Sequence, residues 1–395
     1  MRILHTLIAV LACAALALPA QAQSDARAVA YAAIDPVFEA FMHERNVPGM
    51  VYGVVVGGKL AYVRALGVQD LKTNTPVTSD TVFRIASMSK NFTALAALKL
   101  RDEGKLAFDA PAETLIPEMK GWTYPTTDSP KITLRDLLSH SAGFVTDDPW
   151  GDRQLPMSEA NFSALIKAGV PFERPPGMAF EYSNFGYTLV GRAVSNASGR
   201  NYADYITASF LVPLGMTSSG YDLAQAPAGR LAVGYRWQDG GWAEEPSLGP
   251  GTFGAMGGLN TTANDYARYM AWELAAWPPR DGPEDGILRR SSVREILHGS
   301  NVLMLPERGL GVFAFANRTY AGASPAVREA ALKLVKSGAF PERTAPVRAD
   351  LQAAALVAER IYAAGDVLAA REALAMNVLL DRDAPRRKEI GRAHV

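Results

Sequence analysis

A serine and a lysine stand three residues apart in the stretch RIASMSKNF, residues 84–92. Apolar residues follow at helical spacing, so Ser87 and Lys90 are expected at the start of a helix that ends near Gly104. Residues i and i+3 of a helix share one face. A serine beside a lysine near unpaired backbone N–H groups can act as a nucleophile, because such groups stabilise the negative charge that its attack creates. The alternative is an N-cap serine followed by a solvated lysine.

A second polar group occurs in the stretch EYSNFGY, where Tyr182 and Asn184 flank Ser183. The stretch lies between a loop rich in proline and glycine and an apolar, helix-like run. A tyrosine can exchange a proton with a serine hydroxyl when a nearby lysine stabilises the phenolate. The structural alternative is an aromatic residue that fills a helix–loop junction, with Asn184 capping the helix.

Other chemistries find little support in the sequence. No G-x-S-x-G is present, which argues against an α/β-hydrolase nucleophile elbow. His43 and Glu44 begin an H-E-x-x-H pattern that ends in Val47, and the remaining histidines are scattered, so neither a metal nor another cofactor is expected. The formal net charge is zero, which gives no indication of a nucleic-acid partner or an anionic membrane surface.

The N-terminus has the pattern of a secretory signal. Arg2 precedes an apolar stretch, and Ala20-Gln21-Ala22 is a small-x-small cleavage site, so residues 1–22 are expected to be removed. Lipid attachment at Cys13, the only cysteine, is the alternative interpretation. Later apolar runs are shorter than a membrane span requires. We therefore expect a periplasmic or secreted protein with no membrane span.

The length of 395 residues allows two or three domains, or one large domain with an appendage. Expected elements are a helix over 27–45, a hairpin around Gly57-Gly58, two strands around Glu307-Arg308-Gly309 and a helix over 323–338. Between them lies a mostly helical lobe, about 88–264. This order predicts an α/β fold of the α+β type, in which an antiparallel sheet built from both chain ends is flanked by helices.

The remainder of the chain is expected to lie outside the 23–338 domain. Residues 339–347 have the composition of a linker, and residues 348–389 predict two alanine-rich helices broken at Gly365. The last residues, 390–395, are interpreted as a non-native tail or a disordered basic end, and no function is assigned to them.

Together, S-x-x-K and Y-x-N resemble the serine β-lactamase and penicillin-recognising hydrolase family, in its class C-like branch. The stretches ITLRDLLSHSAGF, YADYITASFLVPLGMTSSGYD and GAMGGLNTTANDYARYM extend the resemblance over about residues 25–340. That branch includes class C β-lactamases, D,D-peptidases, D-aminopeptidases and β-lactamase-like esterases. The resemblance implies a β-lactamase/transpeptidase-like fold.

The resemblance also implies a role for each matching residue. Ser87 would be the acylated nucleophile, Lys90 its partner base, and Tyr182 the proton shuttle to the leaving group. Asn184 would be a polar anchor near Lys90 and the substrate. His140 matches a loop position with a structural role. Lys90 can act as a base only if burial and the helix end lower its pKa.

One part of the family pattern is missing. The resemblance predicts a third motif, Lys or His, a small residue and Gly, on the strand that supplies a second oxyanion N–H. In this sequence only His298-Gly299-Ser300 comes near it, without the final glycine. The connection after Tyr182 is also short, which we interpret as an internal deletion before residue 300, with a degenerate motif at His298 as the alternative. The glycines at 257–258 are expected to allow a tight turn.

The expected function is hydrolysis of an ester or amide through an acyl-enzyme on Ser87, with a small-molecule or peptide substrate. The rival is a penicillin-binding-like protein that keeps the pocket without efficient turnover. The missing third motif separates the two, because loss of one oxyanion donor costs a rate factor of roughly 10²–10³.

Cleavage of the signal is directly testable. If residues 1–22 are removed during export, N-terminal sequencing of the exported protein should begin at Gln23. Recovery of the exported protein with residues 1–22 still attached would contradict this expectation.

Overall fold

The computed structural model describes five stretches of the chain: residues 20–147, 150–249, 251–296, 301–343 and 349–364. It divides into two units, the first ending at Arg343 and the second beginning at Thr344. In the second unit the described part is helix α13 (Ala349–Ala364), and the expected break at Gly365 lies outside the described residues, as do Cys13 and the tail at 390–395. Among the described residues, no helix has the length and apolarity needed to cross a membrane.

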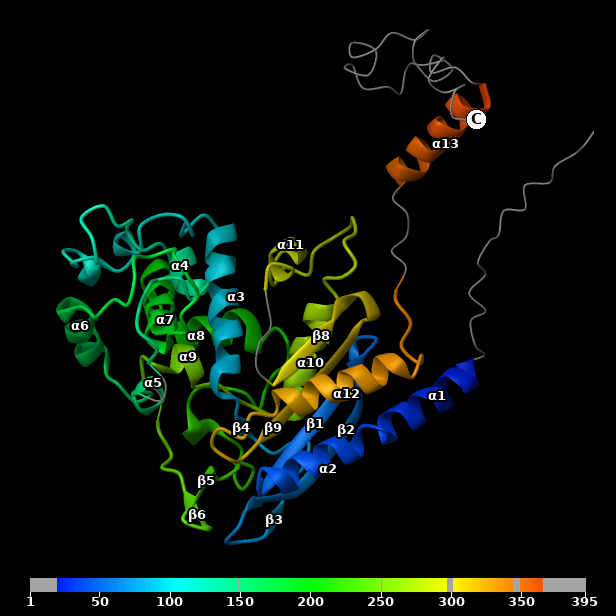
Figure 1. Cartoon of the computed structure of the whole chain (residues 1–395), viewed down its shortest axis with the longest axis horizontal. Helices are drawn as coiled ribbons and strands as arrows, with labels where there is room; N and C mark the ends of the chain where they lie inside the picture. Colours follow the sequence, from blue (N-terminus) through cyan, green and yellow to red (C-terminus); the bar gives the residue numbers. More distant parts are fainter. Residues whose placement is uncertain (1–19, 148–149, 250, 297–300, 344–348, 365–395) are drawn as a thin grey trace, which may run out of the picture. The chain divides into compact units, whose positions relative to one another are not determined.

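A five-stranded antiparallel sheet forms the frame of the first unit (Figure 1). The strands, in spatial order, are β3 (Thr75–Pro76), β2 (Lys59–Asp70), β1 (Gly49–Val56), β9 (Leu310–Ala316) and β8 (Val302–Leu305). Both chain ends therefore contribute to one sheet, as the sequence predicts. Gly57 and Gly58 join β1 to β2 with φ angles of 59° and 80°, which an L side chain rarely adopts.

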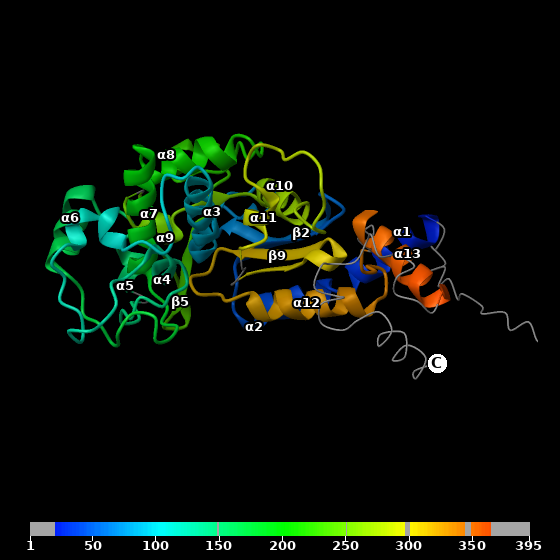
Figure 2. The same cartoon turned by 90° about the horizontal axis from the view of Figure 1, so that it is seen from above.

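Both faces of the sheet are covered by helices, and β1 is buried along its whole length. On one face Met50, Tyr52 and Val54 join a core cluster with α1 (Ala20–Ala32), α2 (Asp35–Glu44) and α12 (Ser324–Lys336). On the other face Val51 and Val55 belong to the larger cluster, which includes α10 (Ala263–Leu274). Figure 2 shows β9 between α12 on one side and α10 on the other.

Gly53 allows a large aromatic side chain to pack on the second face of the sheet. It lies opposite Phe313 of β9, and a Cβ at position 53 would lie 2.7 Å from the Phe313 ring. The missing side chain thus leaves room for a buried aromatic ring at the centre of the sheet.

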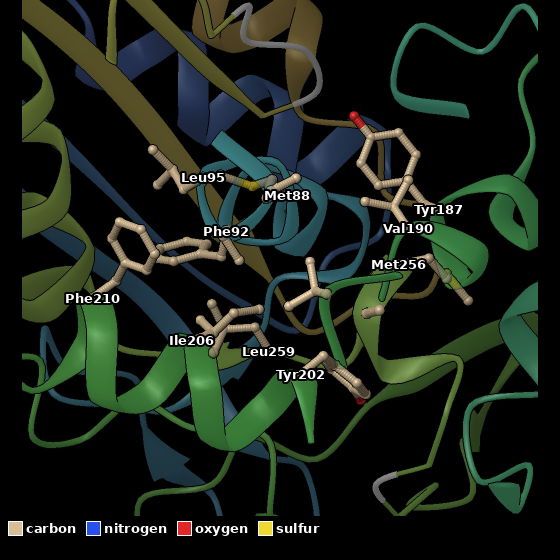
Figure 3. Close-up of a cluster of buried hydrophobic side chains, with 14 of the residues drawn as sticks. Met88, Phe92, Leu95, Tyr187, Val190, Tyr202, Ile206, Phe210, Met256 and Leu259 are labelled. Atoms are coloured by element: carbon tan, nitrogen blue, oxygen red, sulfur yellow. The ribbon is translucent and has the colours of Figure 1, made fainter. Parts of the chain in front are cut away.

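The helical lobe is built around α3, whose buried residues occupy most of its length. The helices of the lobe are α3 (Ser89–Asp102), α4 (Leu134–Leu138), α5 (Trp150–Arg153), α6 (Glu159–Ala168), α7 (Asn184–Ser198), α8 (Tyr202–Ile206) and α9 (Gly254–Gly257). A further short helix, α11 (Arg290–Val293), contacts α3. Side chains from α3, α7 and α8 gather in one apolar cluster (Figure 3). The lobe meets the sheet region through two short antiparallel strands, β4 (Phe83–Arg84) and β7 (Asn260–Thr261).

The helix expected over residues 27–45 is instead two helices, α1 and α2, so this prediction was wrong. The break falls at Ala33 and Ile34, directly before Asp35-Pro36 at the start of α2. Proline has no N–H to donate and disfavours helical backbone in the residue before it, so it ends one helix and begins the next.

A hairpin of β5 (Tyr235–Gln238) and β6 (Gly241–Glu244) also interrupts the expected helical lobe. Its turn is Asp239-Gly240, with φ angles of 51° and 75°. Asp-Gly between β-forming residues is a hairpin signal that the sequence analysis overlooked.

The sheet ends at β8 within the described part of the chain. No strand in those residues pairs with the outer edge of β8, where the family resemblance predicts a further strand. Residues 294–301 are all that separates α11 from β8, in agreement with the short connection noted in the sequence. His298 lies outside the described residues.

A polar cluster fixes α2 to the sheet. The Asp35 carboxylate accepts hydrogen bonds from Tyr52 at 2.6 Å, Tyr62 at 2.7 Å and Arg64 at 2.6 Å. Burial raises the pKa of Asp35, but these three donors outweigh it and the pKa is lowered overall. Burial and the bonded Asp35 raise the pKa of Tyr62 to about 12.

Replacing Asp35 with Asn should destabilise the fold by about 1–3 kcal/mol, because one neutral amide oxygen cannot serve three donors and at least one of them loses its acceptor. Urea unfolding followed by circular dichroism measures the change. Glu39→Gln is the matched control, since Glu39 also pairs with Arg64, at 3.3 Å, but its side chain is 51% exposed. The control should change stability by less than about 0.5 kcal/mol. Equal effects of the two substitutions would contradict this account.

Candidate active site

Ser87 lies in a sharp turn between β4 and α3. Ala86, directly before it, has a φ of 47°, in the left-handed region. The buried Ser89 holds the turn, because its hydroxyl donates to the Ala86 carbonyl at 2.7 Å and accepts from the Leu259 N–H at 3.0 Å. Ser87 itself is only half-buried. The turn therefore presents the Ser87 hydroxyl at the surface of the lobe, at the N-terminal end of α3.

The structure brings the four predicted site residues together. Ser87 Oγ and Tyr182 Oη share a hydrogen bond of 2.6 Å. Lys90 Nζ donates to Ser87 Oγ at 3.1 Å and to Asn184 Oδ1 at 2.8 Å. Ser87 and Lys90 lie one helical turn apart, while Tyr182 and Asn184 come from the start of α7.

Lys90 lies at the centre of this arrangement and is only 5% exposed. Besides Ser87 and Asn184, its ammonium bonds the Met256 carbonyl of α9 at 2.9 Å. It also lies 4.8 Å from the ring centre of Tyr182 and 5.7 Å from that of Tyr187. Three oxygen acceptors and two aromatic faces satisfy a cation that burial would otherwise disfavour.

Asn184 does not cap α7, so the structural alternative considered for it was wrong. The N-cap is Ser183, whose hydroxyl accepts from the Gly186 N–H at 3.0 Å. Asp147 completes the cap by accepting from the backbone N–H groups of Asn184, at 2.8 Å, and Phe185, at 2.6 Å. A carboxylate is favourable at the positive end of a helix. The Asn184 side chain points instead at Lys90, from whose ammonium Oδ1 accepts a hydrogen bond.

Asp147 is the residue of this site that sequence reasoning missed. It lies in a loop with no periodic pattern and far from α7 in the sequence, so only the tertiary fold brings the two together. Gly151 lies on the other side of Asn184, where a Cβ would come within 2.6 Å of the Asn184 Cβ. A larger residue at position 151 would displace Asn184.

His140 positions the Tyr182 segment. Its Nδ1 accepts a hydrogen bond from the Ser183 N–H at 3.1 Å, and its carbonyl accepts from the Glu181 N–H at 2.7 Å. The His140 and Tyr182 rings lie 4.6 Å apart. Burial, with a smaller effect from the Lys90 charge, lowers the pKa of His140 to about 4. The imidazole is therefore neutral at pH 7, as its acceptor role requires.

Of the glycines at 257–258, Gly258 is required by close packing, whereas a Cβ at Gly257 would lie 3.7 Å from its nearest neighbour, in Ala86. Gly258 has an ordinary helical φ of −95°, but a Cβ there would lie 2.7 Å from the Gly254 Cα. Among the described residues, no group of three or more His, Cys, Asp or Glu side chains has an arrangement that could hold a metal ion.

Comparison with known proteins places the chain in a family. The family model described as Beta-lactamase matches residues 34–336, and the chain belongs to this family. Esterase EstB of Burkholderia gladioli is 31% identical over 216 residues, which cover 52% of this chain and 54% of that protein. Protein flp of Staphylococcus aureus (strain COL) is 30% identical over 207 residues, covering 52% of this chain and 41% of flp. The chain thus spans about half the length of the curated relatives it matches.

Solved structures show the same fold. The octameric penicillin-binding protein homologue from Pyrococcus abyssi aligns with a TM-score of 0.65 at 22% identity, over 77% of each chain. The class C beta lactamase from Rhodobacter sphaeroides aligns with a TM-score of 0.60 at 20% identity, over 77% of this chain and 98% of that one. The predicted β-lactamase/transpeptidase-like fold and the family resemblance are therefore confirmed, and the family includes serine hydrolases.

The lowered pKa of His140 predicts a loss of stability in mild acid. The unfolded chain takes up a proton near pH 6.5, whereas folded His140 does so only near pH 4. The contribution of neutral His140 to the free energy of unfolding is fully present above pH 6.5. It falls by about 2–3 kcal/mol as the pH is lowered toward 4. Urea unfolding at several pH values should show this loss in the wild type and not in His140→Gln.

The matched control is His43→Gln, which removes an exposed imidazole from α2. If His140→Gln and His43→Gln gave the same dependence of unfolding free energy on pH, the role assigned to His140 would be wrong.

Proposed function

We propose that this protein is a serine hydrolase that cleaves an ester or amide through an acyl-enzyme on Ser87. The observation that carries the proposal is the contact of the Ser87 hydroxyl with two groups able to exchange its proton, Tyr182 at 2.6 Å and Lys90 at 3.1 Å. Membership of a family with an esterase and a class C beta lactamase among its relatives and structural neighbours supports the same reaction class.

In the proposed acylation, Ser87 Oγ attacks the carbonyl carbon of the substrate and its proton passes to Tyr182 in its phenolate form, or to Lys90 when Lys90 is a neutral amine. Collapse of the tetrahedral intermediate breaks the bond to the leaving group, which takes a proton through Tyr182. Lys90 favours a transient phenolate on Tyr182, because its charge lies near the ring. Water then attacks the acyl carbon and gives its proton to Tyr182, the bond between Ser87 Oγ and the acyl group breaks, the carboxylic acid leaves, and Ser87 takes the proton back from Tyr182.

The oxyanion of the intermediate needs backbone donors. The Ser87 N–H at the start of α3 can be one of them, since no residue in the described part of the chain accepts a hydrogen bond from it. The second donor in the family comes from a strand beyond β8, and the described residues contain no such strand. We therefore propose that Ser87 is acylated by reactive compounds while turnover of ordinary esters is weak.

The lack of a described strand beyond β8 favours a second candidate function. It is that of a penicillin-binding-like protein that retains the pocket without efficient turnover. In either case the proposed substrate or ligand is a small molecule or peptide with an ester or amide bond, no nucleic acid is involved, and export through the N-terminal signal is part of the proposal. Vigorous turnover would exclude the second candidate.

The test measures labelling and turnover on one folded sample. A fluorophosphonate should add its phosphonyl group, the probe less HF, to Ser87, as seen by intact-mass analysis and peptide mapping, while steady-state hydrolysis of p-nitrophenyl acetate stays low. Tyr182→Phe should slow the labelling by roughly 10²–10⁴ without unfolding the protein. Tyr187→Phe is a matched control, because Tyr187 also faces Lys90 but its hydroxyl bonds the Leu138 carbonyl. No labelling of folded wild type, or equal labelling of wild type and Tyr182→Phe, would contradict the proposal.

A further inference from the structure

Large apolar side chains are exposed around the candidate active site. Val145, Trp150, Met178, Phe180 and Tyr320 are between 41% and 70% exposed. Burying such side chains is favourable, so a group of them in water marks a surface that binds something apolar. We call this group the apolar rim; Phe180 and Trp150 belong to segments that contact the candidate site at His140 and Asn184.

Two members of the rim lie beside Tyr182. The Phe180 ring is 5.4 Å from the His140 ring, which in turn packs on Tyr182. The segment of Val145 runs next to this one, because the Thr146 hydroxyl donates to the Glu181 carboxylate. Val145 and Phe180 are thus carried by neighbouring segments on the Tyr182 side of the site.

Trp150 and Tyr320 lie on the other side. Trp150 precedes Gly151, which touches Asn184, and its ring packs edge-on against Phe253 at 5.8 Å. Tyr320 follows β9 and its hydroxyl donates to Asp152 of α5. The rim therefore includes residues from the sheet region and from the lobe, and it extends to both the Tyr182 side and the Asn184 side of the site.

The charged groups beside the rim have partners within the protein. Glu181 lies 3.7 Å from Arg174, and Asp147 accepts the first N–H groups of α7. Arg84, on β4, donates to the Leu248 carbonyl at 2.8 Å. These pairings favour an uncharged group on the substrate, because an ionised one would have to compete with them.

We infer that the rim binds an apolar acyl or alkyl chain, so the preferred substrates are neutral esters or amides with a chain of several carbons. The inference rests on the proposed function, since it assigns a substrate class to the same Ser87 site. The chain would lie against Phe180 and Met178 while its carbonyl carbon reaches Ser87 Oγ.

The test uses alkyl fluorophosphonates from ethyl to decyl. Ser87 Oγ forms a bond to phosphorus, the P–F bond breaks and fluoride leaves, while the serine proton passes to Tyr182 or Lys90. Second-order labelling rates, divided by the hydrolysis rate of each probe in buffer, should rise with each added methylene until the rim is filled, by at most roughly fourfold per methylene. A probe of equal length ending in a carboxylate should label more slowly than its neutral match.

The double variant Met178→Ala/Phe180→Ala should lower the ratio of the longest-probe rate to the ethyl rate by about tenfold or more, since two exposed side chains that make the rim are gone. Leu332→Ala on α12 is the matched control, because Leu332 is 52% exposed on the far face of the sheet. Rates independent of chain length, a double variant that behaves like the control, or faster labelling by the carboxylate probe would overturn the inference alone. Failure of every probe to label Ser87 would overturn the proposed function together with it.

Discussion

The buried ammonium of Lys90 is the constraint on which the site depends. A charge that is 5% exposed must have every donor satisfied, and its acceptors come from Ser87, from Asn184 on α7 and from the Met256 carbonyl on α9. These hydrogen bonds therefore hold the start of α3, the start of α7 and α9, which are far apart in the sequence, in one arrangement. The same three hydrogen bonds place Tyr182 against Ser87, so packing and the proposed chemistry have a common cause.

The other interactions around Lys90 orient the reactive side chains and take no part in the proposed reaction. Ser89 ties the turn of Ser87 to Leu259, and Asp147 and His140 hold the first turn of α7 from outside. The sheet region meets the lobe through β4 and β7, and the missing side chain at Gly53 leaves room for the Phe313 ring. Among the described residues no strand pairs with the outer edge of β8, where the family resemblance predicts a strand with a second oxyanion donor.

Sequence reasoning found the parts whose signals are local. Gly57-Gly58 marks the first hairpin, helical spacing marks α3, and S-x-x-K with Y-x-N marks residues that the fold brings within hydrogen-bonding distance. It failed where position depends on tertiary contacts, since nothing local ties Asp147 to the start of α7. It also missed two local signals, the Pro36 break and the Asp239-Gly240 turn, because a longer pattern was given more weight.

The most direct test of the account is a double-mutant cycle on the labelling rate of Ser87 by a fluorophosphonate, with Lys90→Met, Tyr182→Phe and both together, each shown to be folded by circular dichroism. Groups that act as one unit lose their effect together. The account predicts that the double variant is about as slow as the slower single variant. If the two single losses multiplied in the double variant, Lys90 and Tyr182 would act independently and the central claim would be contradicted.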